Sequence, residues 1–140
     1  MPPLEDFKVN LKLKLSALWA ALMLCYIYGD YFELFLPNQL QNMVNGKVIL
    51  DSPLKLLAAA VLMTVPSVMI FLTLVMKPQL NRWINVGLGL FYTLVMVLVL
   101  SVAISYWRAF YVFLGLVEIT LSLTIAWYAW NWPRQGQKNG

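Results

Sequence analysis

Four long runs of apolar residues dominate the chain, and short polar or basic stretches separate them. The runs cover about residues 15–36, 53–76, 83–104 and 109–130. Each is long enough for an α-helix to cross the hydrocarbon core of a bilayer, which takes about 20 residues. The pattern predicts an all-α polytopic membrane protein: one membrane domain over residues 1–140, built as a four-transmembrane-helix bundle with a polar tail at 131–140.

Helix-breaking and capping residues mark the ends of these runs. The first run stops at Pro37, because proline disrupts a helix interior. Ser52 before the second run is a good N-cap, and Pro53 suits the first helical position. Pro66, in the middle of the second run, predicts a kink. The polar connection at residues 37–52 carries apolar residues at helical spacing, which allows a short helix on the membrane surface.

The basic residues favour one orientation. With the N-terminus inside, seven of the ten Lys and Arg residues lie on the cytoplasmic side, and Lys47, Lys55 and Arg108 lie outside. This bias satisfies the positive-inside rule. We therefore expect an N-in/C-in protein of a bacterial inner (plasma) membrane, with both termini cytoplasmic.

Composition narrows the class of protein. The chain is 61% hydrophobic and 11% charged, whereas soluble domains are about a quarter charged. The bilayer is the expected partner, with homo-oligomers or a membrane-complex partner left open. No solvated basic face remains for nucleic acid. Without histidine, and with Cys25 as the single cysteine, the sequence predicts no metal site, no cofactor and no catalytic residue.

Three acidic residues lie inside the predicted spans, where a charge is costly and usually marks function. Asp30 and Glu33 lie near the outer end of the first span. Glu118 lies roughly 15 Å deeper than Arg108 along the fourth span. Because no cation lies at that depth, we expect Glu118 to be protonated near neutral pH or to share a proton with Tyr26 or Tyr92.

Helical spacing places polar, aromatic and small residues on one stripe of each span. On the second span the stripe contains Ala60, Thr64, Ser67 and Phe71, and on the third Asn85, Gly89, Tyr92 and Met96. On the fourth it contains Trp107, Tyr111, Gly115, Glu118 and Ser122. Turned toward one another, the stripes would give a bundle with a polar interior.

Two candidate sites follow from these stripes. At mid-depth, the residues expected to meet in a proton- or ligand-binding site are Glu118, Tyr26, Tyr92, Thr64 and Ser67. Nearer the outside, Arg108 is placed to pair with Asp30 or Glu33. These three residues would form either an outer gate that contacts a ligand or a structural ion pair.

Three segments resemble an uncharacterised group of bacterial four-helix membrane proteins: Cys25 to Phe35 with Pro37, Leu50 to Pro53, and Trp107 to Tyr111. The resemblance covers most of the chain and implies the same topology, without an established activity. More distantly, size and helix number are similar to the DoxX-like family. That family includes a membrane subunit linked to quinone-dependent sulfur oxidation, and no motif here carries that activity over.

Three classes of function fit these observations. The first is binding or transport of a proton, a cation or a small amphipathic molecule at a buried site centred on Glu118. The second is an accessory or assembly subunit of a membrane complex, docked through the tyrosine-rich face of the first span. The third is a quinone- or lipid-linked enzyme subunit, which is the weakest because the sequence offers no cofactor ligand.

Overall fold

The computed structural model describes residue 4 and residues 8–134, and every regular element among them is a helix. The elements are α1 (Leu11–Glu33), α2 (Gln39–Val44), α3 (Pro53–Val75), α4 (Pro78–Ala103), the 3-10 turn η1 (Tyr106–Arg108) and α5 (Ala109–Trp130). Four helices, α1, α3, α4 and α5 extended by η1, are long and apolar enough to cross a membrane. The predicted all-helical architecture, with four helices that are candidates for membrane spans, is confirmed. Most of the expected polar tail, residues 135–140, lies outside the described residues.

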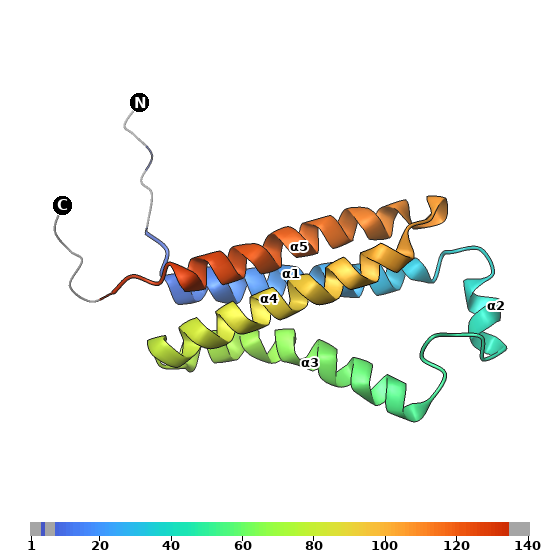
Figure 1. The fold of residues 1–140 in the computed structure, drawn as a ribbon, viewed down its shortest axis with the longest axis horizontal. Coiled ribbons are helices and arrows are strands. Elements are labelled where there is room, and N and C mark those ends of the chain that lie inside the picture. The colour runs from blue at the N-terminus through green and yellow to red at the C-terminus, as the bar shows by residue number, and fades with distance from the viewer. Residues whose placement is uncertain (1–3, 5–7, 135–140) are drawn as a thin grey trace.

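The four long helices run roughly along one common axis (Figure 1), and their contacts link them in the order α3, α1, α5, α4. Helix α1 packs against both α3 and α5, and α4 packs mainly against α5, whereas α3 and α4 contact each other little. Figure 1 shows α3 leaning away from the other helices toward its N-terminal end. The start of α1, the end of α5 and the α3–α4 turn share one end of the bundle, here called the termini end; the opposite end, where α2 lies, is called the α2 end.

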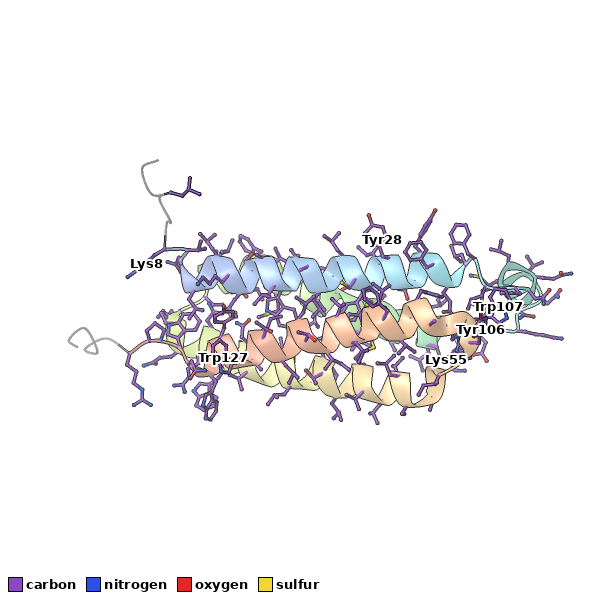
Figure 2. The ribbon with its side chains drawn as sticks, turned by 90° about the horizontal axis from the view of Figure 1, so that it is seen from above. Lys8, Tyr28, Lys55, Tyr106, Trp107 and Trp127 are labelled. Atoms are coloured by element: carbon purple, nitrogen blue, oxygen red, sulfur yellow. The ribbon has the colours of Figure 1, made fainter. Side chains whose placement is uncertain are left out.

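Aromatic and basic side chains gather at both ends. Figure 2 shows Lys55, Tyr106 and Trp107 toward the α2 end and Lys8 and Trp127 toward the termini end. Aromatic and cationic residues at two levels of a helical bundle are typical of the two membrane–water interfaces.

Two spans begin earlier than the sequence indicated. Helix α1 starts at Leu11 rather than near residue 15, because the side chain of Asn10 caps it by accepting a hydrogen bond from the Lys12 backbone at 2.9 Å. Helix α4 starts at Pro78 rather than near residue 83. Proline at the first helical position already has a helical φ and lacks only a donor that would be unpaired there. Residues 78–82, which belong to the basic stretch between the second and third apolar runs, are therefore the start of α4.

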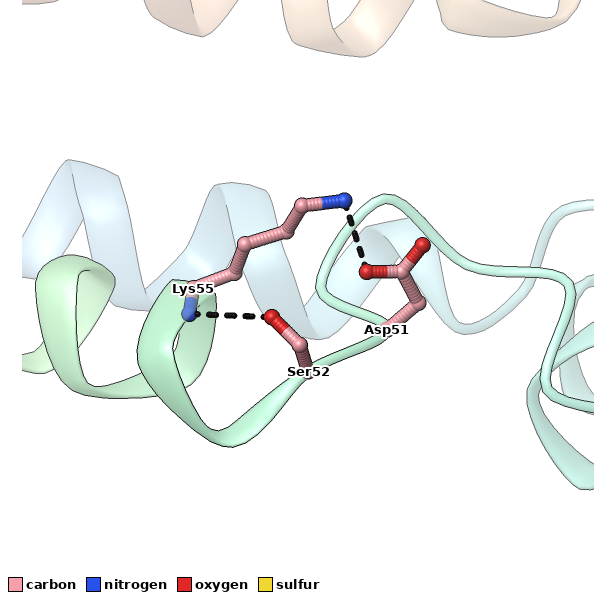
Figure 3. A network of polar contacts seen from close by, with 3 residues as sticks. All are labelled: Asp51, Ser52 and Lys55. Atoms are coloured by element: carbon pink, nitrogen blue, oxygen red, sulfur yellow. Dashed lines mark hydrogen bonds and ion pairs between the residues drawn. The ribbon is translucent and has the colours of Figure 1, made fainter.

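The predicted start of α3 is confirmed (Figure 3). The Ser52 hydroxyl accepts a hydrogen bond from the backbone nitrogen of Lys55 at 3.3 Å, and Pro53 occupies the first helical position. The Lys55 ammonium lies 2.6 Å from the Asp51 carboxylate in an exposed ion pair. These contacts fix where α3 begins.

A buried polar network fastens α1, α3 and α4 together near the termini end. The Asn85 side-chain oxygen accepts a hydrogen bond from the Trp19 indole at 2.7 Å, and its amide donates to the Asn81 side-chain oxygen at 2.6 Å. The Asn81 amide in turn donates to the carbonyl of Thr73 at 2.6 Å. Because both asparagines are fully buried, each bond satisfies a group that lipid could not.

Lys12 holds the C-terminal end of α3. Its ammonium donates to the carbonyl oxygens of Leu74 at 3.1 Å and Met76 at 2.7 Å. The last carbonyls of a helix lack helical partners and carry its partial negative charge, so a cation stabilises them.

Glycine allows the close approach of α4 and α5. A Cβ added at Gly89 would lie 2.8 Å from the carbonyl oxygen of Ser122 and 3.0 Å from the backbone nitrogen of Ala126. Small residues at a helix interface are a common means of packing helices within lipid. Gly87, two residues earlier, has no such neighbour within 4 Å.

Candidate functional site

A small cavity of about 100 Å³ lies between the long helices around Glu118. Its polar and aromatic lining comes from Tyr26, Asp30, Tyr92, Tyr111 and Glu118. Apolar side chains of α3 and α4 complete it: Leu62, Met63, Val95, Met96 and Val99. Because a water molecule occupies roughly 30 Å³ of liquid, the cavity has room for about three waters or one ligand of a few non-hydrogen atoms.

Glu118 is the buried carboxyl group of this cavity. It lies in the middle of α5, on the same buried face as Gly115 and Ser122, and its side chain is 3% exposed. Its Oε2 atom is buried and has no hydrogen-bond partner among the described residues. An unpaired carboxyl group inside a bundle is costly. A proton, a hydrogen-bonding molecule or a cation could satisfy this carboxyl group.

Helix α1 contributes Tyr26 and Asp30, four residues apart and therefore on one face. Tyr26 is 7% exposed, whereas Asp30 is exposed. Asp30 also lies one turn closer to the α2 end. The cavity thus has one carboxyl at depth, that of Glu118, and one at its mouth.

Tyr92 lines the cavity in a different way from that expected. Its hydroxyl donates a 2.5 Å hydrogen bond to the carbonyl oxygen of Leu62. That carbonyl would normally pair with the backbone nitrogen four residues later, but Pro66 has no N–H to give. The hydroxyl proton of Tyr92 is therefore donated to α3 and not to Glu118. Tyr92 offers the cavity its ring.

Thr64 and Ser67 do not reach the cavity, which corrects their assignment to the site. Both are exposed on the outer face of α3, and their hydroxyls donate to carbonyls of their own helix, Ala60 at 2.7 Å and Met63 at 3.2 Å. A hydroxyl satisfied in this way does not need to face the bundle interior. The buried residues of α3 are instead Pro66, Met69 and Thr73.

Glu33 and Asp30, the two acids near the outer end of α1, make different contacts. The Arg108 guanidinium lies 2.7 Å from the Glu33 carboxylate, and the two side chains are 33% and 22% exposed. The structure thus pairs Arg108 with Glu33, one of its two expected partners, and joins the end of α1 to the start of α5. Asp30 stays outside this pair and lines the cavity. Among the described residues that line the cavity, none is basic.

Tyr111 lines the cavity but was not among the predicted site residues. It lies seven residues before Glu118 on the same stripe of the fourth span, and this spacing was the signal available in the sequence.

The lining of the cavity is acidic and aromatic. In the part of the chain that the structure describes, no group of three or more His, Cys, Asp or Glu residues is arranged to hold a metal ion. The lining offers two carboxyl groups and three tyrosine rings. Carboxylates attract cations, and tyrosine faces can hold them further through cation–π contact.

One family matches nearly the whole chain. The match covers residues 4–138 and is described as a family of unknown function, DUF6326. No curated protein and no solved structure matches the chain. The family match fits the expected resemblance to an uncharacterised group. The protein therefore belongs to DUF6326, a family of unknown function.

Proposed function

We propose that this protein binds or transports a proton, a cation or a small amphipathic molecule at the intramembrane cavity centred on Glu118. The observation that carries the proposal is the buried Glu118 carboxyl, which has no hydrogen-bond partner among the described residues and faces a cavity with a second acid and no basic lining residue. Ionisable groups inside transmembrane bundles usually mark ion or substrate pathways.

In this proposal the residues act at successive depths. Asp30 lies at the mouth of the cavity and meets an incoming cation or proton first. Glu118 receives it within the bundle. The Glu33–Arg108 pair, which joins α1 to α5, serves as the outer gate, because its separation would allow the two helices to part at the α2 end.

The proposed setting is a bacterial inner membrane with both termini in the cytoplasm. Support comes from the basic residues at the termini end, which include Lys8, Lys12, Lys14, Lys77 and Arg82. Single cysteines introduced at residue 134 and at residue 47, in a Cys25→Ser background, test it. A membrane-impermeant thiol reagent applied to intact cells should label only the cysteine at residue 47; labelling at residue 134 instead would reverse the orientation.

Flux measurements on reconstituted vesicles test the function. Purified protein in vesicles that contain a pH-sensitive dye should change the internal pH when a proton or cation gradient is applied. Glu118→Gln should abolish this change, because glutamine keeps the shape but cannot take up a proton. Asp51→Asn is the matched control, since it removes a carboxylate that lies outside the cavity. Equal flux through wild type and Glu118→Gln would overturn the proposal.

A second candidate, an accessory subunit of a membrane complex, is favoured by an exposed aromatic cluster at the C-terminal end of α1. Tyr31 packs edge-on against Phe32 and Phe35, with ring centroids 5.7 and 5.3 Å apart, and all three side chains are at least 44% exposed. If this cluster docks a partner protein, Tyr31→Ala should release that partner during purification while leaving vesicle flux unchanged. The more distant likeness to DoxX-like proteins rests on size and helix number and adds no activity.

A further inference from the structure

The lining of the Glu118 cavity restricts which charged ligands it can hold. Anions are disfavoured, because Asp30 and Glu118 repel them when ionised and no basic residue of the lining can pair with them. Hard divalent cations such as Mg²⁺ and Ca²⁺ take six to eight oxygen ligands. Two carboxyl groups set among apolar and aromatic side chains do not supply that number. A cation that carries its own apolar surface fits the lining better.

The aromatic rings supply the second part of such a site. The centroids of Tyr26 and Tyr92 lie 6.2 Å apart with their planes inclined by 43°, and Tyr111 lines the same cavity. Because the Tyr92 hydroxyl is held by Leu62, the position of its ring is fixed. Tyrosine faces attract alkylated ammonium groups through cation–π interaction, and several rings around one such group form a cage.

We propose that the cavity binds a small alkylammonium cation. Its ammonium group lies beside the carboxyl groups of Glu118 and Asp30, and its alkyl groups lie among the rings of Tyr26, Tyr92 and Tyr111. This inference rests on the proposed function and names the ligand class of the same site. The volume of about 100 Å³ limits the ligand to a few non-hydrogen atoms. Met63 and Val95 of the apolar lining contact the alkyl groups.

When Glu118 is protonated, binding of the cation displaces the proton of Glu118. The carboxylic acid loses its proton to water, and the resulting carboxylate pairs with the ammonium group, so one positive charge replaces another. The titratable groups that line the cavity with Glu118 are Tyr26 and Asp30 from α1, Tyr92 from α4 and Tyr111 from α5, and α3 contributes none. Affinity should therefore rise with pH by up to about tenfold per pH unit over the range in which Glu118 titrates.

Calorimetric titration of the full chain in lipid nanodiscs with tetramethylammonium chloride tests this inference. Sodium chloride and tert-butanol are the comparison ligands, the first a cation without alkyl groups and the second an uncharged molecule of similar shape. We expect heat of binding with tetramethylammonium alone and no binding in Glu118→Gln. The measured heat should also vary with the ionisation enthalpy of the buffer, which is the sign of proton release. Equal binding of sodium or tert-butanol, or unchanged binding in Glu118→Gln, would refute the ligand class.

Two substitutions at Tyr26 keep the test decisive if Glu118→Gln fails to fold. Tyr26→Phe preserves the ring and should change affinity by less than about threefold, whereas Tyr26→Leu should weaken binding by about tenfold, the effect of one lost cation–π contact. Equal affinity in the two variants would contradict the aromatic cage. Gel filtration and helical circular dichroism identify any variant that is misfolded.

The outcomes separate this inference from the proposed function. If Glu118→Gln abolishes vesicle flux while wild type binds no tetramethylammonium, the alkylammonium assignment is wrong and the proton or cation site stands. If Glu118→Gln changes neither flux nor binding, both are wrong.

Discussion

The hydroxyl of Tyr92 donates its hydrogen bond to the carbonyl oxygen of Leu62, the carbonyl that Pro66 leaves without a partner in α3. This contact joins α4 to α3 in the middle of the bundle, where the two helices otherwise contact each other little. It also directs the Tyr92 ring toward Trp19, whose centroid lies 5.9 Å away. A proline in one helix is thereby compensated by a tyrosine in another.

We expect Tyr92→Phe to lower the free energy of unfolding by about 1 kcal/mol, because it leaves the Leu62 carbonyl unpaired. Denaturant titration in detergent micelles measures the loss. The control is the same substitution in a Pro66→Ala background, where the alanine N–H can pair with Leu62. The two substitutions should then be non-additive. An additive result would contradict the compensation.

The Glu33–Arg108 pair should stabilise the α2 end modestly. We expect Glu33→Gln to cost about 1 kcal/mol of unfolding free energy, because the pair is partly shielded from water. The matched control is the exposed Asp51–Lys55 pair, whose side chains are 50% and 54% exposed. Lys55→Gln should cost only about 0.3 kcal/mol. Similar losses in both variants would show that the Glu33–Arg108 pair is no more than a surface contact.

The two glycines of α4 should respond differently to substitution. Gly89→Ala should destabilise the protein by about 1–3 kcal/mol, because the new Cβ meets backbone atoms of α5 that cannot move aside without separating the helices. Gly87→Ala meets no atom within 4 Å. It should leave stability unchanged or raise it by up to about 1 kcal/mol through helix propensity. Equal effects, measured by the same unfolding titration, would contradict the close packing of α4 on α5.

The outer face of α3 should tolerate substitution without loss at the cavity. Thr64→Val and Ser67→Ala should leave vesicle flux unchanged, because both residues are exposed, bond within their own helix and do not line the cavity. Stability should change by no more than about 0.5 kcal/mol. Thr93→Val should change stability more than these two variants, because the Thr93 hydroxyl lies 2.7 Å from that of Ser122 between α4 and α5. A loss of flux in Thr64→Val would restore that residue to the site.

The sequence predicted the buried face correctly where a helix carries a distinct polar stripe. On α4, Asn85, Gly89 and Tyr92 recur at helical spacing and are all buried. On α5, Glu118 and Ser122 behave in the same way. In both helices, groups that lipid cannot satisfy must turn toward other helices, so a single sequence reveals the inward face.

The same reasoning was wrong for α3, because its polar residues do not need the interior. Thr64 and Ser67 satisfy their hydroxyls within the helix. The face that packs against α1 is set instead by contacts such as the Ser16 hydroxyl donating to the Ile70 carbonyl at 2.7 Å. A backbone carbonyl is present at every position of a chain, so its choice of partner leaves no mark on residue identity.

Length, apolar periodicity and capping residues determined by themselves that this chain forms four helices able to cross a bilayer, since hydrocarbon requires every backbone group to be paired within a helix. The same pattern also predicted that Glu118 faces the interior of the bundle. Only the tertiary structure decided which groups surround that carboxyl. In that structure the Tyr92 hydroxyl donates to Leu62, Arg108 pairs with Glu33, and Asp30 lies at the mouth of the cavity. These choices depend on distances between helices, and such distances are set by how side chains from separate segments pack together.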